Sequence, residues 1–495
     1  MVVPSSSLSS RAAVRRLVAL VVLGLALTTG WFLSGASDAA DTGAERVPVP
    51  TAVCGPGSHP ETSIQGRTPK ADYTSGRYLE GYLCNTEEVS HAGTTGGFKA
   101  LRYTDAAGHT CAFYDSSQLT SPGDLVSNLL NGQGNGVVVL DMADPAHPVK
   151  TTNLQTLAML APHESLLVNQ ARGLLVGVLG TAATAPGALA VYDVKTDCRH
   201  PKLLSQSLAG ILGHETGFAP DGKTLYVSST VFTLVAVDLT DPTRPKTLFV
   251  QPNVQYHGMR VSDDGRTLYA AHIGQPSPGL ITGAGLRVLD VSQIQDRVRN
   301  PKVPVLADLT WRGSSIPQVA EPFTRDGHQY VLEVDEFVDF YSFAGLSDLM
   351  NSPVGAARII NVDDPRHPFA VSDIRLQVHQ PAEHAGEQTK DPGAASPLGG
   401  YAGHYCSMPT RTSPNLAACS MIGSGLRVFD IRDVEHPKEV AYFNKPAKTG
   451  GSAFSQPAWD LANGSIWYTD TTTGFYDVKL TNGVADLLPT TSTTP

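Results

Sequence analysis

The pattern of apolar and polar positions repeats along most of the chain. Residues 425–437 read GLRVFDIRDVEHP, an apolar strand with an Asp at its end and a turn that closes on His-Pro. The pattern recurs as GVVVLDMADPAHP at 136–148 and as TLVAVDLTDPTRP at 233–245. Shorter or degenerate copies begin at residues 188, 285, 357 and 474. Period-two alternation bounded by Asp, Gly and Pro is typical of β-strands joined by tight turns, so an all-β repeat fold is predicted.

Each repeat predicts four short strands. In one copy the first strand ends at the turn Pro220–Gly222, and a second strand, KTLYV, follows directly. The third strand is the VxVxD stretch, and the fourth follows the DPxxP turn, as in KTLFV at 246–250. Asp accepts backbone N–H groups at the start of a turn, and Pro presets φ at the next position. The second Pro falls where an outermost strand begins, because an edge strand tolerates a residue without a ladder donor.

The number of repeats follows from the residue that ends each third strand. It occurs seven times, at Asp141, Asp193, Asp238, Asp290, Asn361, Asp430 and Asp477. Seven four-stranded antiparallel units predict a seven-bladed β-propeller. The last unit lacks a fourth strand, and Tyr78–Cys84 is a strand-like run outside the repeats. We therefore expect this N-terminal strand to complete the seventh blade and close the ring. An open array, or two packed domains, is the alternative.

The N-terminus has the order of a secretory signal. Arg11, Arg15 and Arg16 precede the apolar run Leu17–Leu33, and small residues follow. This order predicts a signal peptide over residues 1–40, with an uncleaved membrane anchor as the alternative. Cleavage is expected after Ala39 or Ala40.

The remainder divides by composition. Residues 41–77 are polar, rich in Gly, Pro and Thr, and predict an irregular extension. The propeller is expected over residues 78–482, and a flexible tail over 483–495. The formal net charge of −10 provides no basic surface, so nucleic acid is excluded as a partner class.

Six cysteines all lie beyond the signal segment. In an exported chain an even number predicts up to three disulfides, and buried free thiols are the alternative. Two of them flank a short turn and are placed to join neighbouring strands. The cysteines are Cys54, Cys84, Cys111, Cys198, Cys406 and Cys419.

The GxxVxDxxDPxxP copies resemble LVIVD repeats, which characterise a family of exported bacterial β-propeller proteins. The resemblance spans about residues 78–480 and implies the fold and an exported location. It implies little about function, because propellers serve as enzymes, binding platforms and scaffolds alike. Two features depart from the repeat: Asn361 replaces the Asp, and the last unit has no Asp-Pro turn.

Aligning the repeats places a histidine at the start of the innermost strand in four blades. These are His163, His214, His257 and His404, and they are expected to surround one mouth of the central channel. The other three blades carry Ala100, Gln318 and Gln456 near this position.

Further polar residues are expected near the same mouth. Glu164 and Glu215 directly follow two of the histidines, and an insertion reading HQPAEH at 379–384 belongs to the same face. The second strands also end there. The residues expected farther out are Asp115, His272, Glu333, Asp335, His379, Glu383, His384 and Asp470, of which His272, His379, Glu383 and His384 are candidate outer metal ligands.

Three interpretations of the four histidines stay open. Imidazoles suit Zn, Cu, Fe or Ni, so the cluster is a candidate site for a divalent transition metal. Without metal, a histidine could act as a general base with Tyr256, Tyr401 or Tyr405 as the acid. The third interpretation is structural, because a histidine here can bind the neighbouring blade, and the repeats that this chain resembles often carry one.

Other histidine patterns carry less chemistry. HQPAEH has neither the HExxH nor the HxxEH spacing, so a metalloprotease is not predicted. Four histidines that each precede a Pro are expected at solvated outer turns: His147, His200, His367 and His436.

Two function classes follow. The preferred one is a secreted or cell-surface binding or scaffold protein that recognises a glycan, peptide or protein through the histidine-lined mouth, because no motif specifies a reaction. The alternative is an extracytoplasmic metal-dependent enzyme, a hydrolase, lyase or oxidoreductase, with the same histidines as ligands. A membrane is expected as a partner only through an uncleaved N-terminal segment.

Overall fold

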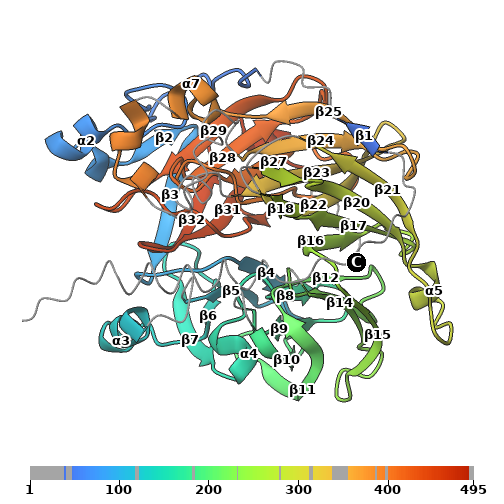
Figure 1. The fold of residues 1–495 in the computed structure, drawn as a ribbon. Coiled ribbons are helices and arrows are strands. Elements are labelled where there is room, and N and C mark those ends of the chain that lie inside the picture. The colour runs from blue at the N-terminus through green and yellow to red at the C-terminus, as the bar shows by residue number, and fades with distance from the viewer. Residues whose placement is uncertain are drawn as a thin grey trace, which may run out of the picture. The chain divides into compact units, whose positions relative to one another are not determined.

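Seven antiparallel sheets are arranged in a ring, which confirms the predicted seven-bladed β-propeller (Figure 1). The computed structural model describes residues 38–40, 47–116, 122–180, 184–230, 232–277, 280–311, 316–336, 355–384, 387–395 and 400–489. The predicted signal segment up to residue 37 and the last six residues of the predicted tail lie outside this part. No helix among the described residues has the length and apolarity needed to cross a membrane.

The strands of each blade run in chain order from the innermost to the outermost, and the seventh blade takes its outermost strand from the N-terminal side. The first three blades are β4 (Ala100–Thr104), β5 (Thr110–Asp115), β6 (Val137–Asp141) and β7 (Val149–Leu154); β8 (Leu167–Asn169), β9 (Leu174–Val178), β10 (Thr184–Asp193) and β11 (Lys202–Gly213); and β12 (Glu215–Phe218), β13 (Thr224–Ser228), β14 (Thr233–Asp238) and β15 (Lys246–Pro252). The next two are β16 (Tyr256–Val261), β17 (Thr267–His272), β20 (Gly285–Asp290) and β21 (Val305–Thr310); and β22 (Ile316–Arg325), β23 (His328–Glu336), β24 (Ala357–Asn361) and β25 (Phe369–Ile374). The last two are β26 (Tyr405–Ser407), β27 (Leu416–Ser420), β28 (Leu426–Asp430) and β29 (Lys438–Asn444); and β30 (Ala458–Asp460), β31 (Ser465–Asp470), β32 (Gly474–Leu480) and β3 (Thr86–Ala92).

Short helices and extra strands lie between these elements. On the side where the innermost strands begin lie α3 (Pro122–Leu130), α4 (Leu157–Leu160), the hairpin of β18 (Gln275–Ser277) and β19 (Leu280–Thr282), and the insertion with η3 (Gln377–His379), α7 (Pro381–His384), η4 (Glu387–Lys390) and η5 (Gly393–Ala395). The opposite ends of the blades carry α5 (Ser292–Gln295) and η6 (Ala485–Leu487). The N-terminal segment contributes β1 (Asp38–Ala40), parallel to β21, and α2 (Lys70–Ser75) and η1 (Arg77–Glu80).

The ring is closed by an N-terminal strand, as predicted, but not by Tyr78–Cys84. β3 pairs with β32 from Thr86 opposite Leu480 to Ala92 opposite Phe475. β2 (Tyr82–Cys84) lies instead along β29, as a fifth strand of the sixth blade. Asn85 has a positive φ of 54° and donates from its side-chain amide to the Val440 carbonyl, so the chain turns from one blade to the next at this residue.

The residue that ends each third strand builds the outer turn. In six blades its side-chain oxygen accepts a hydrogen bond from the backbone N–H two residues later. Asn361 makes the same bond as the aspartates, which explains why the substitution is tolerated. The four histidines of the outer turns are solvated, as predicted, with side chains 67–82% exposed. The repeated motif is therefore architectural.

All six cysteines form disulfides, as predicted: Cys54–Cys84, Cys111–Cys198 and Cys406–Cys419. The last pair joins directly opposed residues of β26 and β27. The second pair ties the outer turn of the second blade to β5. Three disulfides in one chain point to an oxidising, extracytoplasmic compartment.

Candidate metal centre

Four histidines from four blades converge at the axis of the propeller. His163 precedes β8, His214 joins β11 to β12, His257 is the second residue of β16, and His404 precedes β26. All four are buried, and the imidazole centroids of His163 and His214, and of His214 and His257, lie 4.6 Å apart. The alignment of the repeats thus located the cluster correctly.

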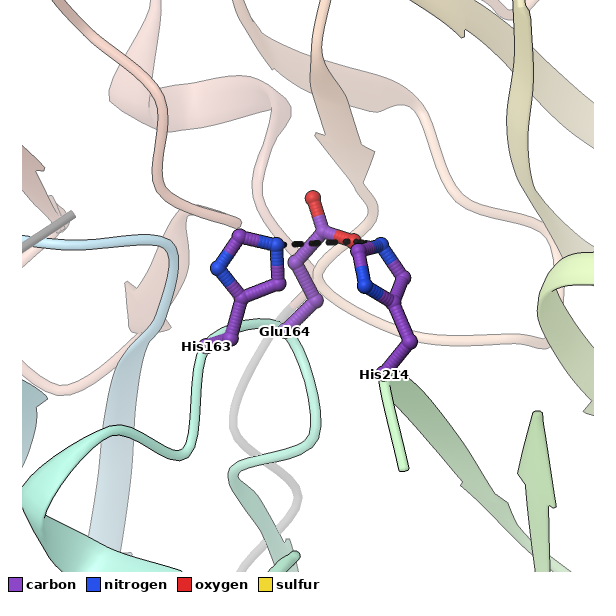
Figure 2. A group of neighbouring side chains, drawn as sticks. All are labelled: His163, Glu164 and His214. Carbon is purple, nitrogen blue, oxygen red and sulfur yellow. Dashed lines mark ion pairs between the residues drawn. The ribbon is translucent and has the colours of Figure 1, made fainter. Parts of the chain in front are cut away.

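Glu164 lies among these histidines, and Figure 2 shows it between His163 and His214. Its Oε2 atom is 3.0 Å from His214 Nε2, 3.4 Å from His257 Nε2 and 4.0 Å from His163 Nε2. Its Oε1 atom is 3.2 Å from His404 Nε2. Four groups of potential metal ligands occur among the described residues, and three of them contain Glu164. This carboxylate is the centre of the cluster.

Glu336, the last residue of β23, is a second carboxylate in the cluster. Its Oε1 atom lies 3.0 Å from His257 Nε2, and its Oε2 atom lies 3.0 Å from His404 Nε2. Sequence reasoning named Glu333 and Asp335 on the same strand instead. Those two side chains bind Arg358, because strand alternation turns residues 333 and 335 to the other face of the sheet.

Hydrogen bonds on the far side of two imidazoles fix their orientation. His404 Nδ1 donates to the Phe454 carbonyl, because a carbonyl can only accept. His257 Nδ1 faces Glu215 Oε2 at 3.4 Å. In their neutral forms both imidazoles therefore present the Nε2 lone pair to Glu164 and Glu336. Imidazoles that bind a metal are held in this way in most metal sites.

A buried column of charges continues along the axis beside the cluster. Lys99 Nζ lies 3.6 Å from Glu215 Oε1, which also accepts from Arg260 Nη1 at 3.2 Å. Arg260 Nε donates to Glu321 at 2.7 Å. Burial lowers the pKa of Lys99 to about 8, so this amine is still cationic at neutral pH. The two cations of this column balance its two carboxylates, Glu215 and Glu321. The column therefore does not neutralise Glu164 and Glu336, which belong to the histidine cluster.

His163 has a strained backbone and lies at the most exposed part of the cluster. Its φ of 53° is in the left-handed region, which side chains other than Gly, Asn and Asp rarely occupy. Successive side chains of an extended strand point to opposite sides, and this conformation lets His163 and Glu164 both face the axis. The His163 side chain is 9% exposed and that of His404 is 0% exposed. The His214 side chain is 8% exposed, so the cluster meets solvent on the side of His163 and His214.

The structure places the proposed outer ligands elsewhere. His272 Nδ1 donates to the Gly283 carbonyl, and His379 accepts from the Leu376 N–H and donates to the Tyr401 carbonyl. Glu383 is half-buried in α7, and the side chain of His384 lies outside the described part of the chain. None of these four belongs to a ligand group among the described residues.

The other residues expected near the mouth also have local partners. Asp115 accepts the N–H groups of Phe98 and Lys99, and Asp470 accepts those of Ser452 and Thr472. Of the three candidate tyrosine acids, Tyr405 lies nearest to the charged column, with its ring 3.8 Å from Lys99 Nζ. The hydroxyl of Tyr401 binds Asp391, and the ring of Tyr256 lies beside Arg287.

The cluster predicts opposite pH dependences for stability and for metal affinity. Burial alone would lower the pKa of His404, but Glu164 and Glu336 raise it to about 9 from 6.5. The stabilisation from this imidazolium is complete below pH 6.5 and is lost as the pH rises to about 9. A metal needs the neutral imidazole, so affinity is expected to rise about tenfold per pH unit for each proton released. Thermal melts with chelator and Zn²⁺ titrations from pH 6.5 to 9 measure both trends, and a pH-independent affinity contradicts them.

No protein-family model and no curated protein sequence matches the chain. Among solved structures it is similar to a protein from Bacteroides uniformis that was proposed to be a 6-phosphogluconolactonase, with 12% identity over 73% of this chain and 93% of that chain and a TM-score of 0.49. It is also similar to a periplasmic gluconolactonase from Pseudomonas aeruginosa, with 11% identity over 70% and 94% of the two chains and a TM-score of 0.48. Identities this low do not transfer an activity to this chain.

Proposed function

We propose that the chain is an extracytoplasmic metalloprotein that holds one divalent transition-metal ion at the propeller axis. The ligands are His214, His257, His404, Glu164 and Glu336. The observation that carries the proposal is the convergence of potential ligand atoms: the Nε2 atoms of three imidazoles and the oxygens of two carboxylates face one another. Once the imidazoles are neutral, the balanced column beside the cluster leaves the two negative charges of Glu164 and Glu336 for a divalent ion to neutralise.

The spacing of the ligand atoms supports this proposal. Neighbouring Nε2 and carboxylate atoms are separated by 3.0–3.4 Å. Ligands at about 2.0–2.1 Å from an ion are about 3.3 Å apart in a tetrahedron and about 2.9 Å apart in an octahedron. Nitrogen and oxygen donors without thiolate suit Zn²⁺, Mn²⁺, Fe²⁺ or Cu²⁺. A small molecule would reach the ion from the side of His163 and His214, where a metal with an open position would act as a Lewis acid.

A second candidate function is supported by the same contacts. As ion pairs between protonated imidazoles and carboxylates, they join five blades, which is what a metal-free scaffold would need at its axis. The glycan, peptide or protein partner of such a scaffold stays a prediction. We also propose that the chain is a member of the LVIVD-repeat family and that its first 40 residues direct export.

Metal analysis of the purified mature protein tests the proposal. We expect about one transition-metal ion per chain, and less than a tenth of that in the His214→Ala/His257→Ala variant, with the β-sheet circular dichroism retained. Metal-free wild-type protein that also fails to bind added Zn²⁺, Mn²⁺, Fe²⁺ or Cu²⁺, together with a collapsed fold in the variant, would refute the metal site and favour a role of the histidines in closing the ring.

A further inference from the structure

The two oxygens of Glu215 have different partners. Oε2 faces His257 Nδ1 at 3.4 Å, whereas Oε1 is held by Arg260 Nη1 at 3.2 Å and by Lys99 Nζ at 3.6 Å. The Glu215 side chain is fully buried. It is not among the proposed ligands, yet it connects one of them to the charged column.

The partners of Glu215 are themselves fixed. Arg260 Nη1 also donates to the carbonyls of Thr216 and Met259, and Lys99 Nζ donates to Gln456 Oε1. Gly258 makes room for the carboxylate, because a Cβ atom there would lie 2.3 Å from Glu215 Oε2 and 2.5 Å from the Gln318 carbonyl. The backbone and two buried cations therefore hold the carboxylate against His257.

We infer that Glu215 is a positioning residue that selects the Nδ1–H tautomer of His257. This inference rests on the proposed metal site. A neutral imidazole has one ring proton, and a carboxylate at Nδ1 keeps the proton there and leaves the Nε2 lone pair for the ion. Without Glu215 the proton can move to Nε2, where Glu336 Oε1 lies 3.0 Å away and accepts it. His257 would then donate a hydrogen bond from Nε2 and could no longer bind the ion through that atom.

Glu321 provides a matched control. It lies in the same column with its side chain 14% exposed, accepts from Arg260 Nε at 2.7 Å and from Gln456 Nε2 at 2.7 Å, and contacts no histidine among the described residues. Replacing either glutamate by Gln removes one carboxylate from the same network. Only the replacement at 215 also removes the negative charge that faces His257 Nδ1 and holds its proton.

The test compares Zn²⁺ affinity in the full-length wild type, Glu215→Gln and Glu321→Gln. We expect Glu215→Gln to bind about 10–100-fold more weakly, the range for lost partners of metal-bound histidines, and Glu321→Gln to stay within about threefold of the wild type. Equal affinities in Glu215→Gln and wild type, or equal losses in both variants, overturn the inference. A wild type that binds no metal refutes the proposed function instead.

Nitrogen NMR of the imidazoles in the Zn²⁺-loaded wild type tests the tautomer directly, and it is decisive even where Glu215→Gln fails to fold. The expected spectrum shows a protonated Nδ1 and a metal-bound Nε2 for His257, assigned by its loss in His257→Gln. A metal-bound Nδ1 or a protonated Nε2 at His257 overturns the inference. If Glu215 served only the folding of the chain, it would not determine which nitrogen of His257 is protonated.

Discussion

A chain that begins at Gly93 is expected to lose its cooperative fold. This deletion removes β3, which pairs with β32 along its length, and leaves the seventh blade with an unpaired outer edge. Each blade packs against two neighbours, so an open ring loses an interface as well as a strand. We expect a destabilisation well above about 5 kcal/mol, seen as a broad low-temperature melt or as aggregation through the exposed edge.

A chain that begins at Asn85 is the control for this deletion. It also lacks β2 and the Cys54–Cys84 disulfide but keeps β3. This chain is expected to be less stable than the full protein, yet to melt in a single transition, because the ring is still closed. Identical melting of the two shortened chains would show that β3 does not hold the ring together.

Glu164→Gln is expected to abolish metal binding while leaving the ring closed. The substitution keeps the shape of the side chain but removes the charge that three imidazoles approach within 3.0–3.4 Å. Removing the hydrogen-bond partner of a metal ligand weakens metal affinity by up to about 100-fold. Removing a carboxylate that is itself a ligand should weaken it by more than that. Titration with Zn²⁺ and metal analysis measure the effect.

Glu333→Gln is the control for this substitution. Burial and the neighbouring Asp335 raise the pKa of Glu333 well above its ordinary value, and its side chain binds Arg358 rather than a histidine of the cluster. We expect wild-type metal affinity in Glu333→Gln. Retention of metal by Glu164→Gln would exclude Glu164 as a ligand.

The repeat made the fold predictable. The Asp at the end of the third strand recurs because one physical task, capping the outer turn, recurs in six blades. The apolar pattern does not predict β3, whose sequence is TEEVSHA. An outermost strand faces solvent on much of its surface and therefore needs no apolar run. The apolar pattern therefore favours the neighbouring run around Tyr82 as the closing strand.

The site was predictable only where it followed the repeat. The four histidines share one register position, so alignment located them. Glu336 occurs once, at the end of a second strand in a single blade, and no repetition marks it. Lys99 lies one position before the aligned Ala100, a shift that moves a side chain to the other face of a strand. Arg260 and Glu321 look like ordinary surface charges until the blades bring them to the axis.

Because β3 closes the ring, the proposed metal ion can bind only late in folding. β3 is synthesised before the first blade and must wait for β32, the last strand among the described residues, before the ring exists. The proposed ligands come from five blades, so a partial chain holds no complete set of them. Affinity for divalent ions follows a fixed order that favours Cu²⁺ and Zn²⁺, and the ion that a protein acquires depends on what is available where it folds. On this proposal the compartment in which the ring closes, rather than the ligand set alone, decides which metal the protein carries.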